Sequence, residues 1–171
     1  KKNQMFDVEI LTSVMFDVEF HNDAIIQGFI SFDVINHQRN HMELYGTKGS
    51  IIVPDPNMFG GSVFASFTES DEWKEYPTED MRLGKINIEN HSGRSNEAAT
   101  NANYRGIGLS EMIDCIEKNN QHRCNGEMAL HVLDMIDSTI KAAQTLTSES
   151  MRTTCELPRY FPEDEVARLM K

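Results

Sequence analysis

Apolar and polar residues alternate along residues 12–20, and this period of two is typical of a half-buried β-strand. The apolar side of the predicted strand carries Val14, Phe16, Val18 and Phe20. After a tight turn, residues 24–34 predict a second strand that is apolar on both faces. One of its faces carries Ile26, Ile30 and Phe32, and the other carries Ile25 and Phe29. Such a strand is expected inside a sheet or beneath a partner, because both of its faces need cover.

Two further hairpins are predicted in the same half of the chain. Residues 42–53 form the first, around a loop with a glycine at each end, Gly46 and Gly49. Residues 62–76 form the second. Residues 77–102 then lose any apolar period, and a loop of this length inside a compact domain is typically functional or disordered.

The last third of the chain has helical periodicity. The stripe of the first helix is Leu109, Met112, Ile113 and Ile116. Asn125 is the predicted N-cap of a longer second helix. The face that we expect this helix to bury carries Ala129, Val132, Leu133, Ile136, Ile140 and Ala143. Residues 153–157 predict a last strand, and Pro162 suits the first turn of a short terminal helix.

Strands in the first part and helices in the second predict an α+β fold. We expect an open, mainly antiparallel sheet with the helices packed on one face. The 171 residues are enough for one domain with a sizeable core, so residues 1–171 are predicted to be a single domain in which residues 158–171 form a tail.

The net charge of −11, from 16 basic and 27 acidic side chains, argues against binding to nucleic acid or to an anionic membrane. No window approaches the roughly 18 apolar residues of a membrane span. The three cysteines include no CxxC pair, which favours a reducing compartment, and we therefore expect a cytoplasmic protein.

Three acid–histidine or histidine pairs have a spacing of four residues: Asp17 with His21, Asp33 with His37, and His37 with His41. In a strand, four residues span roughly 13 Å, so the members of the first two pairs cannot share a metal ion. The third pair converges only if its loop folds back. We therefore expect histidines that face solvent or substrate, and no metal site.

Other local patterns have simpler structural explanations. Gly106 and Gly108 begin a dinucleotide-type fingerprint, but Glu111 stands where the third glycine belongs and no strand precedes the motif. Glu127 and His131 lie one helical turn apart, as surface or capping pairs often do. No catalytic, cofactor-binding or metal-binding residue is therefore predicted in this chain.

Five segments occur in the order and spacing of one known family. They are residues 31–34 (SFDV), 42–50 (MELYGTKGS) and 53–61 (VPDPNMFGG), followed by 105–112 (RGIGLSEM) and 122–133 (HRCNGEMALHVL). In these segments the chain resembles the C-terminal domain of the glucose–fructose oxidoreductase, inositol dehydrogenase and MocA-like oxidoreductases. The resemblance covers about residues 15–157.

The resemblance implies a parent enzyme that is an NAD(P)-dependent oxidoreductase acting on a sugar, a cyclitol or a similar polyol. Members of that family carry an N-terminal domain that binds NAD or NADP and a Glu-Lys-Pro segment with a catalytic lysine. Neither is present in these residues, so the chain looks like a truncated domain that is inactive and binds no cofactor by itself.

Two substrate-binding candidates follow from the same resemblance. His37 aligns with a histidine that follows the strand in the family, and Arg105 opens the Arg-Gly-Ile-Gly-Leu motif. Arg105 would hold a carboxylate or polyol, or alternatively cap a helix. Asn36 and His41 depart from the residues that many members have there, so substrate preference does not transfer.

The resemblance also implies a homodimer or higher homo-oligomer formed through the face of the sheet. The doubly apolar strand suggests the same contact independently, since helices cover only one face. Two alternatives stay open. One is a stand-alone module for small-molecule binding or assembly, and the other is a parent that is an NAD-dependent glycoside hydrolase.

Overall fold

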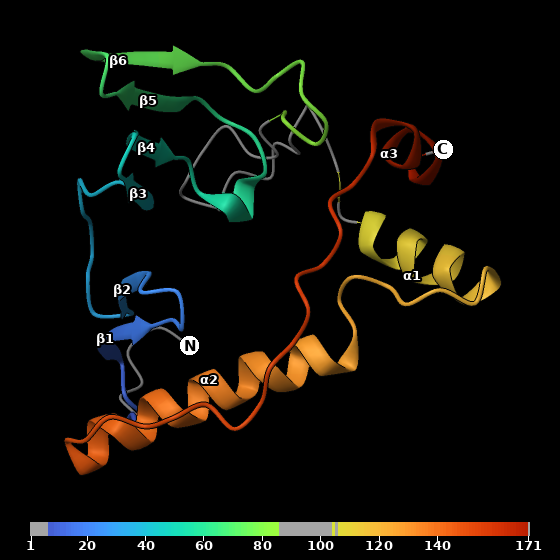
Figure 1. The fold of residues 1–171 in the computed structure, drawn as a ribbon. Coiled ribbons are helices and arrows are strands. Elements are labelled where there is room, and N and C mark those ends of the chain that lie inside the picture. The colour runs from blue at the N-terminus through green and yellow to red at the C-terminus, as the bar shows by residue number, and fades with distance from the viewer. Residues whose placement is uncertain (1–6, 86–103, 105, 171) are drawn as a thin grey trace. The chain divides into compact units, whose positions relative to one another are not determined.

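The computed structural model describes residues 7–85, 104 and 106–170. Its described residues form an α+β fold, as predicted, with antiparallel strands and three α-helices (Figure 1). The strands lie in two sheets, of two and four strands, where the sequence predicted one. The chain divides into two compact units, residues 1–39 and residues 40–171, and each is described by itself. The single domain over residues 1–171 stays a prediction.

The first unit is a hairpin of β1 (Ser13–Glu19) and β2 (Ile25–Ser31). The strands pair antiparallel, with Phe16 opposite Gly28. The turn places Asp23 at φ 63°, a left-handed conformation that aspartate tolerates better than most residues. The predicted alternation is confirmed, because the exposure of the β1 side chains changes at every residue.

The register of the hairpin separates an apolar face from a mixed face. The apolar face has Val14, Phe16, Val18, Ile26, Gly28 and Ile30. The mixed face has Ser13, Met15, Asp17, Glu19, Ile25, Gln27, Phe29 and Ser31. On the apolar face the β2 residues Ile26 and Ile30 are 50% and 59% exposed, whereas the β1 residues Val14, Phe16 and Val18 are half-buried.

The second unit begins with a four-stranded antiparallel sheet. Its strands follow the chain order β3-β4-β5-β6. They are β3 (Met42–Gly46), β4 (Gly49–Val53), β5 (Val63–Phe67) and β6 (Ser70–Tyr76). A short 3₁₀ turn, Pro56–Met58, separates the two predicted hairpins, and Asp55 accepts the backbone N–H of Asn57 at its start. Both hairpins are confirmed.

Three helices follow: α1 (Ile107–Glu117), α2 (Gly126–Thr145) and α3 (Glu163–Leu169). The N-cap prediction for α2 is confirmed, because the Asn125 side chain accepts the N–H of Met128 at 2.9 Å. No helix in the described part of the chain combines the length and apolar character needed to cross a bilayer.

A small apolar core joins α1 to α3. Tyr104, Ile107 and Val166 are its buried members, and Leu83, Phe161 and Leu169 pack against it partly buried. The ring of Phe59 contacts Tyr104 with 4.9 Å between centroids. The main contacts between described elements join neighbouring strands, or join α1 to α3, so the packing of the helices on a sheet face stays a prediction.

The predicted buried faces of the helices are wrong for the described chain. Helix α1 buries Ile107, Glu111 and Cys115, while Ile113 and Ile116 are 49% and 68% exposed. Helix α2 buries two polar residues, Asp134 and Ser138. Its predicted apolar stripe is largely exposed: Leu133 is 60% exposed and Ile136 is 53% exposed. The apolar stripes predicted the two helices correctly, but they predicted the wrong buried sides. The buried positions of α1 and α2 include the charged residues Glu111 and Asp134.

The predicted strand at residues 153–157 is also wrong. The segment between α2 and α3 has no regular structure and returns along α2 before it reaches α3 (Figure 1). Its backbone N–H groups at Arg152 and Thr153 donate to the side chain of Asp134 at 2.7 and 2.9 Å. A side chain therefore provides the hydrogen bonds that a neighbouring strand would have supplied.

Candidate functional site

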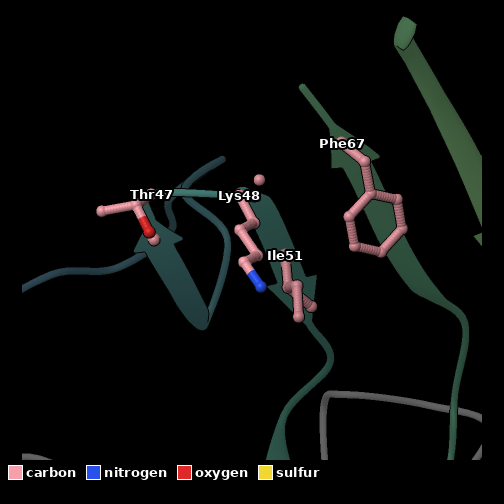
Figure 2. Close-up of a pocket in the computed structure, with 6 residues that line it drawn as sticks. Thr47, Lys48, Ile51 and Phe67 are labelled. Carbon is pink, nitrogen blue, oxygen red and sulfur yellow. The ribbon is translucent and has the colours of Figure 1, made fainter. Parts of the chain in front are cut away.

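A hollow of about 320 Å³ opens beside the turn between β3 and β4 (Figure 2). Its walls are Gly46, Thr47, Lys48, Gly49, Ile51 and Phe67. Gly46 pairs with Gly49, so only Thr47 and Lys48 form the loop. Gly49 lies against the backbone of β5, where a side chain would collide with Ser66 and Phe67. Glycine at this position lets the two strands approach and shapes the floor of the hollow.

The side chains of the hollow offer one cation beside an apolar wall. In Figure 2 the Lys48 side chain extends past Ile51, and the ring of Phe67 comes from the neighbouring strand. The Lys48 ammonium is the only charged group among the described walls of this open hollow. The described walls include no carboxylate or imidazole, so they supply no general acid or base.

A buried ionic junction joins α1, the start of α2 and α3. The guanidinium of Arg123 donates to Glu111 at 2.9 Å and to Glu165 at 2.9 Å. It also donates to the backbone carbonyls of Arg159 at 2.8 Å and Tyr160 at 3.0 Å. With a second bond to Glu165 at 3.2 Å, all five N–H groups of the planar guanidinium are used.

The charges of this junction are matched. The ring of Phe161 lies 3.6 Å from the Arg123 guanidinium carbon, which excludes water from that side. Hydrogen bonds from Arg123 and Arg159 lower the pKa of Glu165 to about 2. Burial raises the pKa of the Cys115 thiol, whose Sγ lies 3.4 Å from Glu111. Two arginines thus face two glutamates, and the thiol stays protonated among them.

A second polar anchor fastens the C-terminal segment to α2. Asp134 is 4% exposed and accepts from the backbone and side chain of both Arg152 and Thr153. Burial alone would raise the pKa of Asp134, but the hydrogen bonds from Arg152 and Thr153 lower it to about 2. The Thr153 hydroxyl also lies 3.0 Å from His131 Nδ1. His131 is therefore bonded to Thr153, where the sequence suggested a surface or capping pair with Glu127.

The two predicted substrate residues lie apart from these features. His37 is exposed, follows β2 and belongs to the first unit. Arg105 lies outside the described residues, as does most of the predicted loop at residues 86–103. Their substrate role stays a prediction. Within the described residues, no group of three His, Cys, Asp or Glu side chains is close enough to hold a metal ion.

The sequence did not predict the buried ionic junction around Arg123 or the polar anchor at Asp134. Glu111 entered the sequence analysis only as the residue in place of the third glycine of a dinucleotide fingerprint. It lies four residues from both Ile107 and Cys115, on one face of the helix. An acidic residue between two inward-facing residues is the available signal for a buried charge that needs a partner. Nothing local marks Arg123 as that partner, because 12 residues separate it from Glu111. Glu165, the second acid bonded to Arg123, lies 42 residues from it.

Comparison with known proteins gives no assignment: no family model, no curated protein and no solved structure matches the chain.

Proposed function

We propose that this chain is the substrate-binding and oligomerisation domain of an NAD(P)-dependent oxidoreductase that acts on a sugar, a cyclitol or a similar polyol. The parent enzyme supplies NAD or NADP and the catalytic residues from another domain. The chain alone is expected to be inactive and to bind no nicotinamide cofactor. What carries the proposal is the order and spacing of the five family-like segments.

The positions of these segments support it. The first three lie on β2, β3, β4 and the turns that follow, and the last two include much of α1 and the start of α2. Several of their residues hold the second unit together: Glu111 and Arg123 form the buried ion pair, and Asn125 caps α2. Residues with such structural roles support a shared scaffold more strongly than a shared substrate.

Ligand titration of the chain tests the substrate-binding part of the proposal. We expect ligand-observed NMR to detect weak binding of inositols or hexoses, and we expect His37→Ala to weaken it. His21→Ala is the matched control, since His21 is an exposed histidine at the opposite end of the same hairpin. Equal losses in the two variants, or no binding of any polyol, would remove the support for a substrate domain.

Calorimetry with NADH and NADPH tests the cofactor part. The chain has no βαβ pattern around residues 106–111, so we expect no binding heat from either compound. A dissociation constant in the micromolar range would contradict the proposal. The reading frame upstream of Lys1 provides an independent test, because a glycine-rich strand-turn-helix and a Glu-Lys-Pro segment are expected there.

The partly exposed apolar face of the β1–β2 hairpin favours a second candidate, an assembly module without catalysis. A soluble monomer rarely exposes a continuous apolar patch of several hundred Å². We expect light scattering to show a dimer that Ile30→Glu dissociates, because Ile30 lies on the apolar face. Phe29→Glu, on the mixed face, is the matched variant and should have the smaller effect. A monomeric wild type would contradict the oligomerisation role in both candidates.

A further inference from the structure

We draw no further inference here: the strongest candidate, the hydrogen-bonded cluster of His131, Thr153 and Asp134 between α2 and the segment that follows it, belongs to the polar anchor already described.

Discussion

Two regions of the second unit differ in what they bury. The junction between α1 and α3 buries charged side chains, whereas the outer side of α2, which carries Leu133 and Ile136, exposes apolar ones. At the junction, Arg123 and Glu165 are at least 90% buried and bonded to each other. On the outer side of α2, Leu133 and Ile136 are more than half exposed. The chain thus buries matched charges at the junction, beside a small apolar core, and exposes apolar side chains on α2. Buried position and apolar character are therefore separate properties in these helices.

Removing Arg123 is expected to have the largest effect. Arg123→Ala leaves the carboxylates of Glu111 and Glu165 buried, with no counterion for Glu111, and should lower the free energy of unfolding by about 3–5 kcal/mol. Urea unfolding followed by circular dichroism measures this loss. Lys141→Ala is the control, since its pair with Glu149 is 59% exposed on the lysine side and is worth under about 1 kcal/mol. Equal losses would show that the junction is open in solution.

The apolar side of the comparison is tested by Ile136→Ala. A face packed on a sheet, as the sequence predicted, would lose about 2–5 kcal/mol. With Ile136 53% exposed, we expect about 1 kcal/mol in dilute protein, because only part of the side chain leaves water on folding. A loss of several kcal/mol would show that Ile136 is buried in solution.

The two regions also differ in how far the sequence predicts them. Alternation of apolar residues predicted β1, and a short loop with a glycine at each end predicted the hairpin of β3 and β4, because both signals are local. The same kind of pattern placed α1 and α2 correctly but assigned the wrong side of each to the interior. Glu111 and Asp134 occupy interior positions because they meet Arg123 and Arg152, which lie 12 and 18 residues further along the chain. Helical spacing carries no information about partners outside the helix.

Acid titration tests the buried ionic junction at Glu165 and the polar anchor at Asp134 together. The pKa of Glu165 is lowered from 4.5 to about 2, and that of Asp134 from 3.8 to about 2. Both carboxylates therefore bind protons more readily in the unfolded chain, so their stabilisation is complete above about pH 4.5 and is lost as the pH falls to 2. The Asp134→Asn variant should show a shallower fall over this range. A curve as steep as that of the wild type would mean that Asp134 is not bonded to Arg152 and Thr153 in solution.

The smallest expected effect concerns Asn125, which lies between the two regions at the start of α2. Its side-chain oxygen accepts the N–H of Met128 at 2.9 Å, and its amide donates to the carbonyl of His122 at 3.3 Å. Asn125→Ala leaves that N–H unsatisfied and should cost about 1 kcal/mol in thermal unfolding. Asn125→Ser keeps an accepting oxygen and should recover most of the loss. Equal losses in the two variants would show that the accepting oxygen of Asn125 does not stabilise the start of α2.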